Sequence, residues 1–206
     1  MSGKFSKIWI GLLIAGQLAL GWDPVYGHDP KSSPLEQGAP RRQVRLPVRG
    51  FSLTNQEGRA FRFEKLKGKL VLASFIYTSC PDVCPLITAN MKAVQEKLKS
   101  TERRSVHFIS ITTDPEIDSP EVLKAYAKRY GVDFSNWSFL TGTLEELKPI
   151  WKNFGVKVER RERGLINHTS LTALIDAEGV MRFAHYGSSP DPKKMLEDAR
   201  SLLSQP

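Results

Sequence analysis

Hydrophobic residues along the central part of the chain follow two different periods, one typical of buried strands and one typical of helices. Apolar residues run almost without interruption through "KLVLASFIY" (69–77) and "VHFISIT" (106–112), as expected for strands buried on both faces. Between them, apolar residues recur at helical spacing: Ile87, Met91, Val94 and Leu98. The pattern predicts two parallel strands joined by a helical crossover.

Two hairpins flank this central unit. The first covers residues 49–66, where Phe51 and Leu53 alternate with polar residues before an "NQEG" turn. The second covers residues 170–187 and turns at "DAEG" (176–179). Because the strands of a hairpin are antiparallel, the sheet is expected to be mixed.

Three further helices are predicted from their end signals. The segment 118–131 has Ser119 as its N-cap and a glycine stop. The segment 143–155 starts with a capping box and contains Pro149, which is expected to kink or restart the helix. The segment 191–205 is an amphipathic terminal helix.

The resulting order is hairpin, then β-α-β-α-β-α, then hairpin and helix, with "WSFLTG" (137–142) as the third strand. This order predicts an α/β fold of the thioredoxin-like type. A mixed central sheet is flanked by helices, with an added N-terminal hairpin and an insertion around 118–131. At 206 residues, with 40% hydrophobic and 25% charged residues, the chain has the composition of one globular domain.

The N-terminal segment has the features of an export signal. Lys4 and Lys7 precede an uncharged apolar run over residues 8–21, shorter than the roughly 20 residues that span a bilayer. We expect residues 1–27 to be a signal peptide cleaved after Gly27; the alternative is an uncleaved anchor that associates the protein with the membrane. Both place the domain outside the cytoplasm, in the periplasm or at the outer face of the inner membrane, where thiols tend to oxidise.

Residues 28–44 are rich in proline, serine, glycine and charge and lack apolar periodicity. This composition predicts a flexible tether. The thioredoxin-like domain is therefore expected to cover residues 45–206.

The formal net charge of +8 comes from basic residues scattered in short groups such as "RRQVR" and "ERRER". There is no basic stripe interleaved with aromatic residues, so the pattern argues against nucleic-acid binding. A solvated surface is favoured over attraction to anionic lipid or an acidic partner.

The turn "CPDVCP" (80–85) contains the only two cysteines, Cys80 and Cys84. Because a residue before proline avoids the α region, Cys84 is expected to cap the next helix, with Pro85 in its first turn. Such a turn can bring the cysteines within disulfide distance, and the helix dipole favours thiolates. The pair can form a disulfide, bind a soft metal or stay inert. A structural zinc site requires four protein ligands, whereas Cu(I) can be bound by two thiolates and one imidazole.

The four histidines are the candidates for a third ligand. His28 lies in the tether. His107 opens a buried strand, where a hydrogen bond in the core or at its edge is expected, and His185 ends a strand and is expected at the surface. His168 lies in a loop just before a strand, and such a loop can return beside the helix that follows the cysteines. Spacing alone leaves its role open.

Four separated blocks, "YTSCPDVCP", "ITTDPEIDSPEVLKAYAKRYG", "FLTGTLEELKPIWKNFGV" and "NHTSLTALIDAEG", resemble the Sco/SenC family of copper-binding proteins, in family order and over roughly residues 45–205. The resemblance implies a thioredoxin-like fold that binds one copper ion, as Cu(I), Cu(II) or both. The ligands it implies are Cys80, Cys84 and His168. Cys80 and Cys84 are also the pair expected to form a disulfide, and the catalytic residues if the site is redox-active.

The same resemblance implies a role in the assembly of cytochrome c oxidase. The protein would be an extracytoplasmic metallochaperone that delivers copper to the binuclear copper site, a thiol-disulfide reductant of that site, or both. The implied partner is the copper-bearing subunit or another copper or thiol protein. The alternative is a thiol-disulfide oxidoreductase without essential metal. Such enzymes of the thioredoxin type resemble each other in a CxxC turn and a later cis-proline; this chain has CxxxC and no proline between Pro149 and Pro190, which favours metal.

One position departs from the family pattern. Asn167 stands where the family usually has an aspartate before the ligand histidine, so a carboxylate that could orient the imidazole is missing. Asp82 matches the family and is expected either to add negative charge or to accept backbone N–H bonds in the turn. Asp114 and Asp118 also match and are expected to shape and cap the loop before the second helix.

Overall fold

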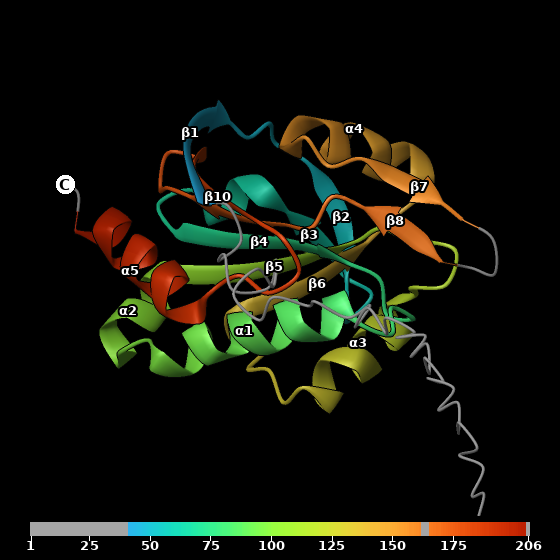
Figure 1. Ribbon diagram of the computed structural model, residues 1–206, viewed down its shortest axis with the longest axis horizontal. Helices are drawn as coiled ribbons and strands as arrows, with labels where there is room; N and C mark the ends of the chain where they lie inside the picture. The colour runs from blue at the N-terminus through green and yellow to red at the C-terminus, as the bar shows by residue number, and fades with distance from the viewer. Residues whose placement is uncertain (1–40, 162–164, 205–206) are drawn as a thin grey trace, which may run out of the picture. The chain divides into compact units, whose positions relative to one another are not determined.

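The structure is a computed structural model of the chain and describes residues 41–161 and 165–204 (Figure 1). Its centre is an eight-stranded mixed sheet with the strand order β1-β10-β9-β4-β5-β6-β2-β3, beside a two-stranded sheet of β7 and β8. The strands are β1 (Arg41–Pro47), β2 (Ser52–Asn55), β3 (Ala60–Arg62), β4 (Leu70–Ile76), β5 (Val106–Thr112), β6 (Trp137–Thr141), β7 (Val158–Arg160), β8 (Ile166–His168), β9 (Leu171–Ile175) and β10 (Val180–Tyr186). The helices are η1 (Phe63–Leu66), α1 (Val83–Lys97), α2 (Ser100–Ser105), α3 (Pro120–Arg129), α4 (Leu144–Phe154) and α5 (Pro192–Leu203).

The predicted α/β fold of the thioredoxin-like type is confirmed. Strands β4, β5 and β6 are parallel, whereas β9 pairs antiparallel with β4, so the sheet is mixed. All seven residues of β4 are buried, as its continuous apolar run predicts. Both predicted hairpins form, as β2–β3 and β9–β10.

Helices cover both faces of the sheet. Figure 1 shows α1, α3 and α5 on one side and α4 on the other. Successive residues of β4 enter different cores: Leu72 packs with the apolar faces of α1, α3 and α5, and Val71 packs with α4. The strand is therefore held between two hydrophobic cores.

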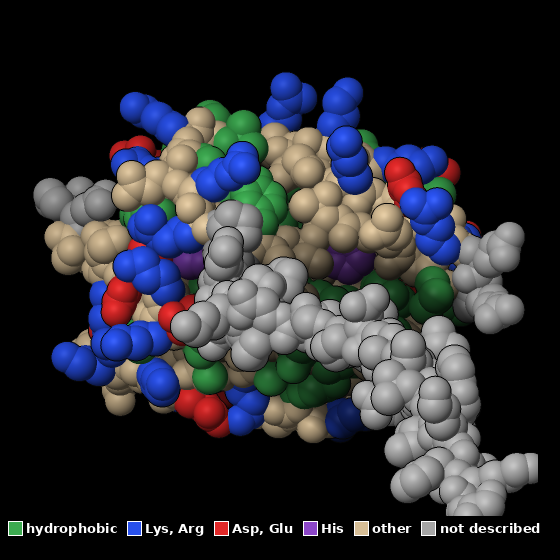
Figure 2. All heavy atoms as spheres, in the orientation of Figure 1, with side chains coloured by type: hydrophobic (Ala, Val, Ile, Leu, Met, Phe, Trp, Pro, Cys, Tyr) green, Lys and Arg blue, Asp and Glu red, His purple; other side chains and the backbone are tan. Residues whose placement is uncertain are grey.

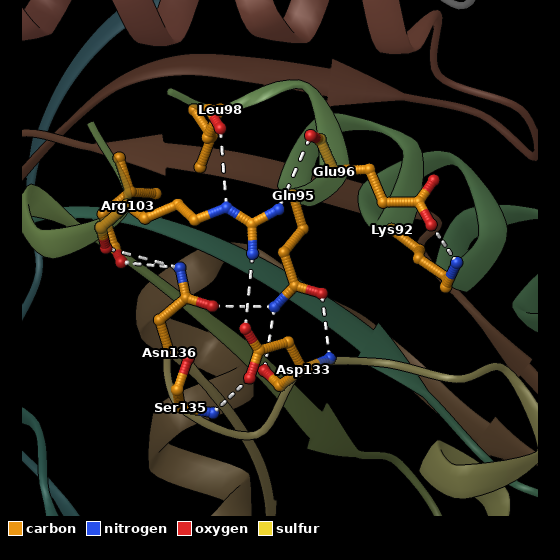
Figure 3. A network of polar contacts seen from close by, with 9 residues as sticks. Lys92, Gln95, Glu96, Leu98, Arg103, Asp133, Ser135 and Asn136 are labelled. Carbon is orange, nitrogen blue, oxygen red and sulfur yellow. Dashed lines mark hydrogen bonds and ion pairs between the residues drawn. The ribbon is translucent and has the colours of Figure 1, made fainter. Parts of the chain in front are cut away.

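Polar side chains fix the C-terminal end of α1 (Figure 3). The side chain of the buried Gln95 donates to Asn136 Oδ1 at 2.7 Å and accepts from the backbone N–H of Asp133 at 3.0 Å. Arg103 donates to the Leu98 carbonyl and to Asp133. These contacts hold the far end of the helix that starts at the cysteine turn.

Several helices and strands differ from those predicted from the sequence. Helix α4 runs as one helix through Pro149, without the predicted restart. Pro149 and Glu145, whose carbonyl loses its helical partner, are both exposed, so water can satisfy that carbonyl. Helix α2 and strands β7 and β8 were not predicted from the sequence; they have six residues or fewer each.

The start of the domain differs from the prediction as well. Strand β1 begins at Arg41, inside the predicted tether 28–44, and pairs antiparallel with β10. The Arg41 guanidinium lies 4.4 Å from the centre of the Phe183 ring. A basic residue of the predicted tether therefore packs onto the sheet. The predicted leader 1–27 lies outside the described residues. Over the described ranges, no helix is long and apolar enough to cross a membrane.

Lys and Arg side chains are scattered over the face seen in Figure 2, with Asp and Glu among them. This dispersion agrees with the short basic groups in the sequence.

The prediction that His185 lies at the surface is wrong. Its exposed fraction is 2%, because α5 covers this end of β10. The ring Nε2 lies 2.9 Å from Asp198 Oδ2 but is not aligned for a hydrogen bond, and burial lowers the pKa of His185, so the imidazole is neutral. Asp198 accepts two hydrogen bonds from Arg41, at 2.6 and 2.7 Å. This cluster ties together β1, β10 and α5.

Replacement of the buried carboxylate by Asp198→Ala is expected to lower the free energy of unfolding by about 2–3 kcal/mol, because it breaks a largely buried, doubly hydrogen-bonded ion pair. Urea denaturation at pH 7 measures this change. The control is Glu197→Ala, which removes an exposed pair with Lys194 and should cost at most about 0.5 kcal/mol. Equal losses in the two variants would contradict the structural importance of the cluster.

Candidate metal centre

Cys80 and Cys84 lie in the turn that joins β4 to α1. The helix begins at Val83 with Asp82 as its N-cap, so Cys84 is the second helical residue and not the predicted cap. Pro85 still falls in the first turn, where no backbone N–H is required. The Asp82 side chain makes no capping hydrogen bond to the start of α1.

The two sulfurs are in different environments. Cys84 is fully buried among the side chains of the α1 core, whereas Cys80 is half-buried. Both are free thiols in this structure, and the backbone N–H of Cys84 points at the Cys80 sulfur with an N–Sγ distance of 3.4 Å. The disulfide between them therefore stays a prediction for the oxidised state.

His168 approaches the turn from a segment far along the chain. It is the last residue of β8, and its Nε2 lies 3.8 Å from Cys84 Sγ, across 84 residues of sequence. Its Nδ1 lies 3.1 Å from the carbonyl of Thr169. Since a carbonyl only accepts, Nδ1 carries the proton in the neutral ring and the Nε2 lone pair faces the sulfur. The ring also packs edge-on against Tyr77, with 5.9 Å between ring centres.

The local contacts shift the pKa values of the two cysteines in opposite directions. The Cys84 thiol donates to Cys80 and, with backbone N–H groups of the turn, lowers the pKa of Cys80 to about 5. That same hydrogen bond and burial raise the pKa of Cys84. Burial raises the pKa of Tyr77 to about 12 and lowers that of His168. At neutral pH the reduced site therefore holds one thiolate, one thiol and one neutral imidazole.

Asn167 lies on the opposite face of the β7–β8 hairpin from His168 and is exposed. A side chain at this position points away from the imidazole, because neighbouring residues of a strand point to opposite faces. The carbonyl of Thr169, not residue 167, contacts Nδ1 here. The departure from the family pattern therefore leaves the histidine with a hydrogen-bond acceptor.

Asp118 has a larger role than the loop shaping that the sequence predicted. Its buried carboxylate accepts from the hydroxyls of Thr78 and Thr112, both at 2.5 Å, and from the backbone N–H of Thr78. Burial raises the pKa of Asp118. The carboxylate thus ties the cysteine turn to the end of β5. Ser119 caps α3 as predicted.

Of the remaining histidines, the two that the structure describes are not at the site. His107 Nε2 lies 3.0 Å from Ser138 Oγ, so the predicted hydrogen bond is confirmed, and His185 is beside Asp198. His28 lies outside the described residues.

The donor set fits a soft metal ion. Across residues 41–161 and 165–204, no three His, Cys, Asp or Glu side chains already stand in ligating positions, so binding requires side-chain movement. The Cys80 side chain can make such a movement, because it is only half-buried. Two sulfurs and a neutral imidazole suit Cu(I), and they are too few for structural zinc.

Comparison with known proteins matches residues 40–204 to the SCO1/SenC family model. The chain belongs to the SCO1/SenC family. It is 36% identical over 160 residues to the SCO1 protein homolog of Bacillus subtilis (strain 168), covering 75% of this chain and 81% of that protein.

Two solved structures of the same family support the assignment. BsSco, described as a member of the Sco family of cytochrome c oxidase assembly proteins, matches with a TM-score of 0.70 and 33% identity over 80% of this chain and 98% of its own. Arabidopsis thaliana ScoI with copper bound matches with a TM-score of 0.69 and 26% identity over 78% of this chain and all (100%) of its own. The resemblance to the Sco/SenC family seen in the sequence is thus confirmed.

The two cysteines of this SCO1/SenC protein are expected to react with iodoacetamide very differently. Cys80 should be labelled first at pH 7, because its pKa is lowered to about 5 and its sulfur is partly exposed. In Cys84→Ala the thiol that donates to Cys80 is removed, and the midpoint of the Cys80 rate against pH should rise towards the ordinary value of about 8.5. Mass spectrometry of limited labelling gives both results. In urea-unfolded protein the two cysteines should react alike; equal labelling in folded protein would contradict the asymmetry.

Proposed function

We propose that this SCO1/SenC protein binds one copper ion through Cys80, Cys84 and His168 and serves the assembly of the copper site of cytochrome c oxidase, outside the cytoplasm. The observation that carries the proposal is the approach of His168 Nε2 to Cys84 Sγ, at 3.8 Å, from segments far apart in the sequence. Related proteins support it: ScoI of Arabidopsis thaliana has copper bound, and BsSco belongs to a family of oxidase assembly proteins.

Each residue of the site has a distinct role in this proposal. The Cys80 thiolate is ready to bind Cu(I), while Cys84 must release its proton as the metal binds. His168 offers a neutral Nε2 whose orientation is fixed by the Thr169 carbonyl. Because Cys80 is the more exposed cysteine, a partner's thiolates can approach the bound copper from its side.

The asymmetry of the cysteines favours a second candidate, thiol-disulfide reduction of a partner protein. The Cys80 thiolate would attack a partner disulfide, forming a mixed disulfide and releasing one partner thiolate. Cys84, after losing its proton, would attack the Cys80 sulfur, forming the Cys80–Cys84 disulfide and releasing the second partner thiolate. Two electrons pass to the partner, and an external thiol reductant would restore the dithiol. A single thiolate pair can serve both functions.

Titration of the reduced full-length protein with Cu(I), against a competing chelator and without oxygen, tests the first candidate. One copper per chain is expected. Cys80→Ala and Cys84→Ala should abolish tight binding, and His168→Ala should weaken it by at least about tenfold, since loss of even an outer-shell partner costs 10–100-fold. His107→Gln is the matched control and should bind within about twofold of wild type.

Two results would contradict copper binding as proposed. If His168→Ala binds copper as tightly as wild type while Cys80→Ala does not, His168 is not a ligand. If the reduced protein binds no copper but reduces a partner disulfide, the second candidate is the function.

A further inference from the structure

The hairpin that carries His168 is not part of the main sheet. Within the described residues, strands β7 and β8 pair with each other and with no other strand, so no ladder of backbone hydrogen bonds joins them to β4, where the cysteine turn begins. Beyond the covalent link from β8 to β9 through Thr169 and Ser170, the position of the imidazole relative to the sulfurs therefore depends on contacts of the hairpin's side chains.

The register of the hairpin places Arg160 among those contacts. Val158 pairs with His168, and Arg160 pairs with Ile166. Since opposite residues of an antiparallel pair, and residues two apart in a strand, share a face, all four side chains lie on one face. Ile166 is buried in the same core as α1. Among these four residues, Arg160 is the one with a charged side chain, which is 43% exposed.

Arg160 reaches from the hairpin to the loop that follows β5. Its Nη2 donates to Asp114 Oδ1 at 2.5 Å and lies 3.0 Å from Glu116 Oε2. The Asp114 side chain is only 1% exposed, and its second oxygen has no hydrogen-bond partner among the described residues. Removing the guanidinium would leave a buried carboxylate without its compensating charge, which is costly.

The same loop also holds the cysteine turn. Asp118 accepts from both the backbone N–H and the hydroxyl of Thr78, two residues before Cys80. Within the loop, the Asp118 N–H donates to the Asp114 carbonyl at 2.9 Å. One short segment thus contacts the cysteine turn through one carboxylate and the histidine hairpin through the other.

We infer that Arg160 is a positioning residue: by pairing with Asp114 it holds the β7–β8 hairpin against the cysteine turn and so places His168 beside the sulfurs. The consequence for metal binding rests on the proposed copper function, whereas the clamping of the hairpin does not. The clamping of the hairpin can therefore be measured without metal, and its effect on copper binding with metal.

The metal-free test is hydrogen exchange in the reduced full-length protein. In Arg160→Gln, amides of residues 157–161 and 165–169 should exchange about tenfold faster or more, because the hairpin opens locally, while amides of β4 and β5 keep their protection. Arg160→Lys should restore part of the protection.

The matched control is Arg161→Gln. Arg161 is the next residue, and it pairs with Glu159 at 2.8 Å, with both side chains about 60% exposed. It should leave exchange unchanged. Equal exchange of the hairpin in Arg160→Gln and Arg161→Gln would overturn the inference.

The test with metal compares copper affinity in two backgrounds. Arg160→Gln should weaken copper binding about tenfold in the wild-type background, in the range found for outer-shell residues, and reduce the imidazole nitrogen signal in the Cu(II) electron paramagnetic resonance spectrum. In the His168→Ala background the same change should have no further effect beyond about twofold.

An equal loss of affinity in both backgrounds would show that Arg160 does not act through His168, and would refute this part of the inference. A wild-type protein that binds no copper would instead refute the proposed function. Hydrogen exchange would still decide whether Arg160 clamps the hairpin.

Discussion

The burial of β4 on both faces is the constraint on which the rest of this structure depends. Its residues alternate between two hydrophobic cores, and hydrogen bonds to β5 on one side and β9 on the other leave the strand no free edge. The strand ends where the cysteine turn begins, and the Thr113 N–H donates to the carbonyl of Ile76 at this point. The carboxyl ends of parallel strands are where α/β sheets commonly hold their ligands. Here they bring the turn and the loop after β5 together.

The chemical difference between the two cysteines follows from that placement. The turn enters α1 directly, so Cys84 is drawn into the core while Cys80 stays at the boundary with solvent. A buried thiol that donates to a neighbouring sulfur keeps its own proton and stabilises a thiolate next to it. Copper binding and thiol exchange can both start from this pair, in which an accessible thiolate lies beside a thiol that is buried in the core. The geometry therefore supports two chemistries with one arrangement.

The features that the sequence predicts are those that depend on residues close together along the chain. The strands β4 and β5 and the helix α1 follow from apolar periodicity, and Pro85 locates the turn, because these signals are local. The short β7–β8 hairpin has three residues in each strand and no periodicity, so spacing left His168 open until the family resemblance supplied it. His185 was misplaced because its cover comes from α5. Arg160 was missed because its partner, Asp114, lies 46 residues away and only the fold brings them together.

The two segments that carry the proposed ligands differ in how firmly the fold holds them. The cysteine turn is fixed by a central strand, by a helix anchored at its far end through Gln95, and by Asp118. Among the described residues, the β7–β8 hairpin has no backbone pairing to the main sheet; it depends on its link to β9, on its packed inner face and on Arg160. A metal that must be handed on has to lose its ligands in sequence, and the ligand on the less constrained element can leave with the least rearrangement of the core. In the proposed function, the imidazole is therefore the ligand suited to release first, while the two sulfurs keep the ion until a partner's ligands replace them.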